Sequence, residues 1–150
     1  MLDEKEYITQ TNADATGRVL TTTDASDNIQ WMAYDVAGML KGSRLKLKEN
    51  NEQVIVKSIA YAANGQKQRE EHGNGIVTTY NYEPETQWLI AIKTERPAGH
   101  SAEANLLQDL RYPYDPVGNV ISISNDAEET RFWHNQKVEP ERVYTYDSLY

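Results

Sequence analysis

The heptapeptide Tyr34-Asp35-Val36-Ala37-Gly38-Met39-Leu40 recurs as Tyr114-Asp115-Pro116-Val117-Gly118-Asn119-Val120, and both copies read Tyr-Asp-x-x-Gly-x-apolar. An Asp side chain accepts hydrogen bonds from backbone groups two residues further on, and Gly supplies the positive φ of a tight reversal. We expect the Tyr to end one strand and the apolar residue to begin the next. The motif therefore predicts a β-hairpin.

Four partial copies accompany the two full ones. Asp14 and Gly17 keep the acid and the glycine, while Tyr61 and Gly65 keep the tyrosine and the glycine. Tyr82 precedes an acid, and Tyr146-Asp147 open a copy that we expect to be truncated at residue 150, before its Gly. The steps are 21 residues (Gly17 to Gly38), 27 (Gly38 to Gly65), 21 (Tyr61 to Tyr82), 32 (Tyr82 to Tyr114) and 32 (Tyr114 to Tyr146). Such variation is expected of hairpin repeats, because insertions fall in their connections.

The segments between the turns alternate as strands do. Residues 76–82 place Ile76, Thr78, Tyr80 and Tyr82 on one face, and Val143-Tyr144-Thr145-Tyr146 repeats the pattern. Leu106–Tyr114 is expected to be a strand with an edge or bulge at Pro113, which has no N–H to donate. A short helix over Ala102–Leu107, capped by Ser101, is the alternative for the start of that strand. The sequence predicts an all-β fold of consecutive antiparallel hairpins, one segment over residues 1–150 without a separate domain boundary.

Composition supports this fold class and excludes several functions. Ten Tyr and three Trp stand against one Phe, and amphipathic aromatic rings suit half-buried sheet faces. The formal net charge of −8 opposes nucleic-acid binding, so we interpret the basic stretch Lys41–Lys48 as a solvated strand or loop. The absence of cysteine excludes disulfides and thiol chemistry. There is no apolar run long enough to insert into a membrane, and the polar Met1–Glu6 does not resemble a signal peptide.

Candidate chemical sites all have simpler structural explanations. His72, His100 and His134 lack metal-ligand spacing, and Asp24–Asn28 lacks the Gly and Glu of a calcium loop, which makes it a turn. The segment His72–Gly75 is expected to be a hairpin turn, because no Lys-Ser/Thr follows it. The acid pairs Glu70/Glu71, Glu83/Glu85 and Glu128/Glu129 are interpreted as solvated charge, and no serine lies in the Gly-x-Ser-x-Gly setting of a hydrolase nucleophile. We predict no catalytic, cofactor-binding or metal-binding residue. Trp31, Trp88 and Trp133 either pack along the sheet or line a carbohydrate-binding surface.

The Tyr-Asp-x-x-Gly units resemble the YD/RHS-repeat family. Longer stretches are similar to the C component of the insecticidal toxin complexes (Tc toxins): residues 82–89, 93–97, 107–120, 132–141 and 144–150. The family's self-cleaving aspartates lie near the end of its repeat region, whereas Asp115 sits in an ordinary repeat, so no protease role is assigned to it.

The resemblance implies that the repeats coil into a β-sheet strip that is part of a hollow shell. In that family, the shell is completed by a B component and encloses a C-terminal toxic domain. A pore-forming A component delivers the toxic domain into a host cell. This chain would then be a structural segment of a secreted bacterial toxin and not an enzyme. The alternative is a YD-repeat module that binds carbohydrate or a host surface.

For either of these two functions, the residues of the repeat motif are expected to determine the fold. They are Asp14, Gly17, Tyr34, Asp35, Gly38, Tyr61, Gly65, Tyr82, Tyr114, Asp115, Gly118, Tyr146 and Asp147.

Overall fold

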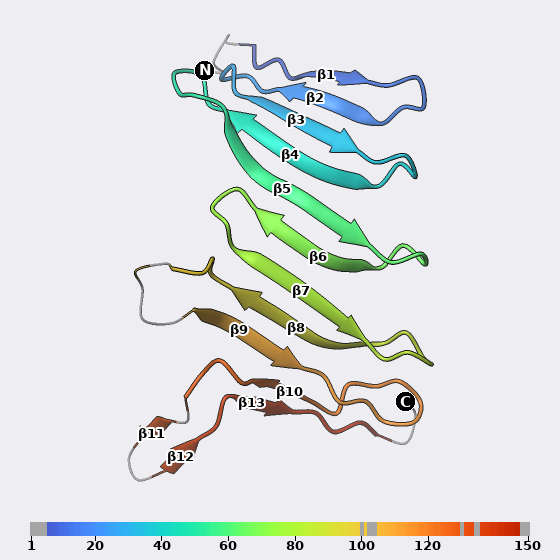
Figure 1. Ribbon diagram of the computed structural model, residues 1–150, viewed down its shortest axis with the longest axis vertical. Coiled ribbons are helices and arrows are strands. Elements are labelled where there is room, and N and C mark those ends of the chain that lie inside the picture. Colours follow the sequence, from blue (N-terminus) through green and yellow to red (C-terminus); the bar gives the residue numbers. More distant parts are fainter. Residues whose placement is uncertain (1–5, 100, 102–104, 130, 134–135, 148–150) are drawn as a thin grey trace, which may run out of the picture. The chain divides into compact units, whose positions relative to one another are not determined.

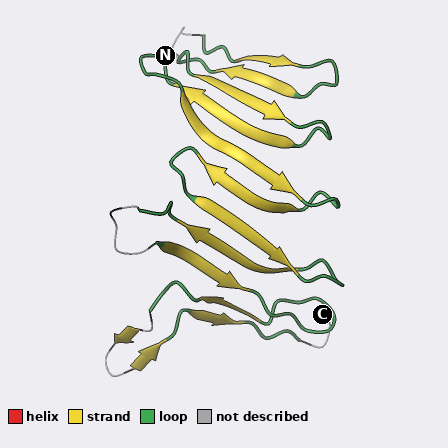
Figure 2. Cartoon of the chain, viewed as in Figure 1, coloured by secondary structure: helices red, strands yellow, loops and turns green. Residues whose placement is uncertain are grey.

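The computed structural model describes residues 6–99, 101, 105–129, 131–133 and 136–147. The regular secondary structure in these ranges consists of β-strands, with no helix (Figure 2). The all-β fold class predicted from the repeat is therefore confirmed. The described ranges also contain no helix that is long and apolar enough to cross a membrane.

The described residues form thirteen strands, which follow one another in sequence. They are β1 (Gln10–Ala13), β2 (Val19–Thr23), β3 (Ile29–Tyr34), β4 (Leu40–Lys46), β5 (Gln53–Tyr61), β6 (Lys67–His72), β7 (Val77–Tyr82), β8 (Leu89–Glu95), β9 (Leu106–Arg111), β10 (Ser122–Asn125), β11 (Arg131–Trp133), β12 (Gln136–Val138) and β13 (Glu141–Val143). Eleven of them are ordered in one sheet as they are in the chain, with β13 after β10, while β11 and β12 form a two-stranded sheet (Figure 1). This order is that of consecutive hairpins.

The chain divides into two compact units, which are described separately. Unit 1 comprises Met1–Ala60 and Glu70–Asn74, and unit 2 comprises Tyr61–Arg69 and Gly75–Tyr150. In unit 1 the strands β1 to β5 are antiparallel neighbours, and Trp31 on β3 lies between Thr21 of β2 and Arg44 of β4. In unit 2 the strands β7, β8, β9, β10 and β13 are antiparallel neighbours, and Ala91 on β8 lies between Asn81 and Arg111.

A register shift recurs where a strand enters a motif turn. It lies between Asn12 and Ala13 before the first turn, between Ala33 and Tyr34 on β3, and between Asn81 and Tyr82 on β7. A bulge adds local twist and re-aims the side chain that follows it. In these three repeats the shift therefore sets the direction of the residue at the tyrosine position, which is Ala13, Tyr34 or Tyr82.

Apolar burial is slight in the described residues. Ala91 is the one buried hydrophobic residue, at 2% exposure, whereas the buried polar residues are Ser43, Thr78, Asp109 and Ser122. On the sheet face of unit 2, the hydroxyls of Thr78 and Thr94 on adjacent strands lie 3.1 Å apart. Most strand side chains are half-buried, as the excess of Tyr over Phe suggests, and a sheet of this kind needs another layer or partner to cover its faces.

Two strands end earlier than the alternation predicted. The strand expected over Leu106–Tyr114 ends at Arg111, and Tyr114 makes only an isolated bridge with Val120. Pro113 explains the difference, because it has no N–H for the ladder and contributes only its carbonyl, which accepts from Ile121 N–H at 2.8 Å. The strand expected over Val143–Tyr146 ends at Val143. The alternative helix over Ala102–Leu107 is wrong at its end, because Leu106 and Leu107 belong to β9; residues 102–104 lie outside the described ranges.

Candidate functional site

The motif turns share one backbone geometry. In the first, Asp14 N–H donates to the Arg18 carbonyl at 2.8 Å and Gly17 N–H donates to the Asp14 carbonyl at 3.0 Å. The same pair of bonds closes the turns 35–39, 62–66 and 115–119 at 2.8 to 3.1 Å. The glycines at these turns, Gly17, Gly38, Gly65 and Gly118, have φ of 83° to 96°. Such values favour glycine because it has no Cβ.

The acidic side chain of each turn holds the backbone that follows it. Asp14 Oδ1 accepts from the N–H groups of Thr16 and Arg18 at 2.8 and 3.0 Å, and Asp115 Oδ1 accepts from those of Val117 and Asn119, both at 2.9 Å. Asp35 Oδ1 accepts from Met39 N–H at 2.9 Å. These are the local bonds that Asp forms in turns. The third turn has Ala62 at this position, and there Asn64 Oδ1 accepts from Gln66 N–H at 3.0 Å.

The turn Asp24–Asn28 uses this geometry without glycine, whereas the turn after Tyr82 is one residue longer, closed by Glu83 N–H to the Trp88 carbonyl at 2.8 Å and Gln87 N–H to the Glu83 carbonyl at 2.9 Å. Asp24–Asn28 is a turn, as predicted, and Asp27 occupies the glycine position with φ 64°. Asp24 Oδ1 accepts from the N–H groups of Ser26 and Asn28 at 2.8 and 3.0 Å. The turn after Tyr82 places Gln87 at φ 63°. An Asp at such a position is recognisable in sequence because Asp tolerates this region, whereas Gln gives no such signal.

Each of four motif tyrosines donates its hydroxyl hydrogen to a backbone carbonyl of the preceding repeat. Tyr34 binds the carbonyl of Val19, Tyr82 that of Lys67, Tyr114 that of Leu89 and Tyr146 that of Val120, at 2.8 or 2.9 Å. Every acceptor stands two residues after the positive-φ residue of a turn. These bonds connect one turn to the next, and their partners were not apparent from the sequence because 15 to 26 residues separate them.

Three of the motif tyrosines end strands, as the repeat predicts. Tyr34, Tyr61 and Tyr82 are the last residues of β3, β5 and β7. Tyr146 and Asp147 follow β13, and the rest of that copy, residues 148–150, lies outside the described ranges.

Trp88 packs within the sheet of unit 2. Its ring centroid lies 5.0 Å from that of Tyr114, and an added Cβ on Gly118 would lie 2.9 Å from its Cζ2. Trp88 therefore packs against the neighbouring turn, which is one of the two alternatives that the sequence left open. The side chain of Trp133 and the whole of His100 and His134 lie outside the part that the structure describes.

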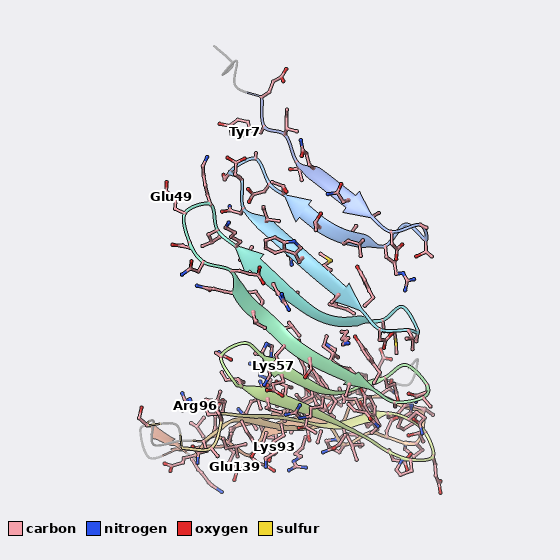
Figure 3. The ribbon with its side chains drawn as sticks, turned by 45° about the horizontal axis from the view of Figure 1, so that its top comes forward. Tyr7, Glu49, Lys57, Lys93, Arg96 and Glu139 are labelled. Carbon is pink, nitrogen blue, oxygen red and sulfur yellow. The ribbon has the colours of Figure 1, made fainter. Side chains whose placement is uncertain are left out.

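Charged groups are paired on the exposed faces. In unit 1 Arg44 pairs with Glu52 at 3.0 Å and Lys57 with Glu71 at 2.5 Å, and in unit 2 Lys93 pairs with Glu95 at 2.9 Å (Figure 3 labels Lys57 and Lys93). Exposed pairs of this kind stabilise a fold little. The basic stretch 41–48 lies mainly on β4, as a solvated strand.

The described residues contain no group of three His, Cys, Asp or Glu placed to hold a metal ion. The carboxylate of Asp109 is the one buried polar side chain among them with an oxygen, Oδ1, that lacks a hydrogen-bond partner. Its other oxygen pairs with Arg111 at 2.9 Å. A depression in unit 1 is lined by Trp31, Lys41, Arg44, Glu52 and Lys57, among others, and the last three of these are held in ion pairs.

The turn carboxylates are expected to make stability fall in acid. The side-chain hydrogen bond from Thr16 and the N–H of Arg18 lower the pKa of Asp14 from 3.8 to about 2, and the N–H of Asn119 lowers the pKa of Asp115. Because the folded pKa is lower than the unfolded one, the stabilisation is complete above about pH 4 and is lost as the pH falls towards 2. The urea midpoint should therefore decrease between about pH 5 and pH 2.

The doubly substituted variant Asp14→Asn, Asp115→Asn is the control for this prediction. It keeps two acceptor oxygens and removes both titrating groups, so its midpoint should depend less on pH over the same interval. Equal slopes for the two proteins would contradict the assignment.

Known proteins closely similar to this chain are toxin subunits. No family model matches the chain. Toxin subunits YenC2 and YenC1 of Yersinia entomophaga are 65% and 62% identical over 150 residues, which is 100% of this chain and 16% and 15% of theirs. The chain thus spans about a sixth of the length of these curated relatives.

Solved structures give the same result. The crystal structure of TcdB2-TccC3-Cdc42 matches with a TM-score of 0.86 and 65% identity over 100% of this chain and 7% of that chain. The Photorhabdus luminescens Tc holotoxin pore matches with a TM-score of 0.83 and 67% identity over 96% of this chain and 6% of that chain. The repeats, the geometry of their turns and these relatives all indicate the same kind of protein. Over its whole length the chain is similar to a segment of these toxin subunits, as the resemblance of its repeats to C components predicts.

Proposed function

We propose that this chain forms part of the wall of a hollow shell that encloses a C-terminal toxic domain until it is delivered into a host cell. One observation carries the proposal: all 150 residues align, at 65% identity and a TM-score of 0.86, with a structure of TccC3 bound to TcdB2. By this similarity the partners are a B component and, through it, a pore-forming A component. The site of action is outside the bacterium that makes the protein.

The geometry of the sheet supports a structural role. The thirteen motif residues from Asp14 to Asp147 act in this proposal as fold determinants, since the acids and glycines shape the turns and the tyrosines connect successive units. The slight apolar burial is also what one wall of a larger enclosure would show, because its faces need other layers to cover them.

No catalysis is assigned to these residues. The carboxylates of Asp14, Asp24 and Asp115 are held by two backbone N–H groups each. Such bonds favour the ionised form, which makes these groups poor proton donors at neutral pH.

A segment exchange tests the proposal. The matching segment of YenC2 is replaced by this sequence, and the chimaera is combined with the B component that belongs to YenC2. We expect co-elution of the two proteins and protection of the C-terminal region from protease. The same chimaera with Gly118→Val is the matched control, and it should lose that protection. A chimaera that folds and co-elutes but leaves its C-terminal region as protease-sensitive as a free domain would contradict the proposal.

A further inference from the structure

The turn between β5 and β6 contains an Asn-Gly pair, Asn64–Gly65. Asparagine followed by glycine is prone to spontaneous deamidation, because glycine has no side chain to obstruct attack by its backbone nitrogen. In that reaction the nitrogen of Gly65 loses its proton and bonds to Cγ of Asn64, while the Cγ–Nδ2 bond breaks and ammonia leaves. Water then opens the cyclic imide to aspartate or isoaspartate. The reaction requires neither an enzyme nor an oxidant.

Hydrogen bonds hold both reacting groups of this pair. The Gly65 N–H donates to the Ala62 carbonyl at 2.9 Å, which retains the proton that the nitrogen must lose. Asn64 Oδ1 accepts from the Gln66 N–H at 3.0 Å, and Asn64 Nδ2 donates to Gln66 Oε1 at 2.6 Å and to Gln87 Oε1 at 2.7 Å. An amide nitrogen carries two hydrogens, so both hydrogens of the leaving group are engaged. Attack on Cγ therefore requires several of these bonds to break first.

Gln87 belongs to the turn between β7 and β8, and its side chain is oriented by that turn (both turns lie on the right in Figure 1). Its Nε2 donates to the Pro84 carbonyl at 2.7 Å, which directs its Oε1 towards Asn64. Its backbone carbonyl accepts from Gln66 Nε2 at 2.8 Å. The φ of 63° at Gln87 is unfavourable for this residue type, and glycine would adopt it without strain. The glutamine side chain therefore supplies an acceptor that the unstrained residue would lack.

We propose that Asn64 is a deamidation site that the folded chain suppresses, with Gln87 as the residue that positions the Asn64 amide away from attack. The site becomes reactive when the turn after Tyr82 opens locally. An aspartate formed there has no hydrogen to donate and places a negative charge against the amide oxygens of Gln66 and Gln87. An isoaspartate also lengthens the backbone by one methylene. The modified turn cannot close as before, so the modification is a permanent record of the opening.

The protection of Asn64 is independent of the proposed shell function, because the bonds that provide it all lie within unit 2. Failure of the segment exchange would leave the protection untouched. An unprotected Asn64 would likewise leave the shell function untouched.

The variant Gln87→Gly separates the protection of Asn64 from the stability of the turn. Glycine adopts the positive φ without strain, so the variant should keep the turn. It removes the acceptor of the Asn64 amide, and we expect Asn64 to deamidate about fivefold faster than in the unsubstituted chain, which is the effect of one net hydrogen bond. A purely structural role for position 87 predicts the opposite result, because an unstrained turn would open less often.

The rate is measured by peptide mass spectrometry after incubation of the 150-residue chain in mildly alkaline buffer. Trypsin places Asn64 in the peptide 58–67 and the second Asn-Gly pair, Asn74–Gly75, in the peptide 70–93. The second pair is the matched reference within the same molecule and should react at the same rate in both proteins. Hydrogen exchange of the Gly65 amide reports closure of the turn and should also be unchanged.

Three results would overturn the proposal. The first is an Asn64 that reacts at the same rate, or more slowly, in Gln87→Gly. The second is faster deamidation accompanied by an equal increase in exchange of the Gly65 amide, because the turn would then have loosened as a whole. The third is an equal acceleration at Asn74, which would indicate a general loss of stability and no specific role for Gln87.

Discussion

Gly118→Val is expected to lower the melting temperature of the chain by about 6–12 °C, which corresponds to about 3 kcal/mol at this chain length. Two costs combine at this position. The φ of 96° is one that a β-branched residue adopts only with strain. In addition, a Cβ would lie 2.9 Å from Cζ2 of Trp88, a ring already packed on Tyr114. The measurement is thermal unfolding followed by far-ultraviolet circular dichroism.

Gly17→Val separates the two costs. Its φ of 84° imposes the same backbone strain, but no atom lies within 4 Å of the added Cβ. We therefore expect a smaller loss for Gly17→Val than for Gly118→Val. In the double variant Trp88→Ala, Gly118→Val the collision with the Trp88 ring is absent. The losses in the free energy of unfolding of the two single variants should therefore not add, and the deviation should match the difference between Gly118→Val and Gly17→Val. A Gly118→Val protein that melts like the unsubstituted chain, or an additive double variant, would show that Trp88 does not restrict this turn.

Gly73→Ala is expected to cost about 2–4 kcal/mol for a different reason. Gly73 N–H donates to the Ile55 carbonyl at 3.0 Å. An added Cβ would collide with the carbonyl oxygen of Val54 and lie 2.6 Å from its carbonyl carbon. Because these are backbone atoms, they cannot rotate away, and the chain around Gly73 must separate from β5.

Gly42→Ala is the matched comparison, since Gly42 also approaches β5. Its Cβ would lie 3.0 Å from the carbonyl oxygen of Val56, a tight contact that a small shift relieves, so its cost should be lower. Exchange of the amide of residue 73 reports the effect locally and should be faster in Gly73→Ala than in Gly42→Ala. If Gly73→Ala and Gly42→Ala unfold at the same urea concentration, the close approach does not limit the fold.

The hairpins were predictable because the residues that determine each turn lie close together in the sequence. The acid, the glycine and the tyrosine of a turn lie within five positions, so Asp35, Gly38 and the end of β3 at Tyr34 follow from a short stretch. Pro113 was also recognisable as a break, although the earlier end of β9 was not. Its missing N–H ends β9 at Arg111, and beyond it only the Pro113 carbonyl and the isolated bridge of Tyr114 with Val120 continue the pairing.

Contacts between distant residues were not predictable in the same way. The sequence predicted His72–Gly75 as a turn, which is correct, but it did not indicate that Gly73 is needed for its approach to Val54. The contact of Trp88 with Gly118 depends on β8 lying beside the next turn, and nothing near Gly118 in sequence reports it. Likewise, the positive φ of Gln87 is imposed by the turn around it, since the residue type has no preference for that region.

The tyrosine hydroxyl bonds have a consequence for how such sequences are compared. Tyr34 and Tyr82 reach back 15 residues, whereas Tyr114 and Tyr146 reach back 25 and 26, yet all four acceptors hold the same position after a turn. The extra residues lie at the opposite end of the hairpins, between β8 and β9 and between β10 and β13. Alignments anchored on each tyrosine and its acceptor would superpose units of unequal length, which a search for a fixed period would leave unmatched.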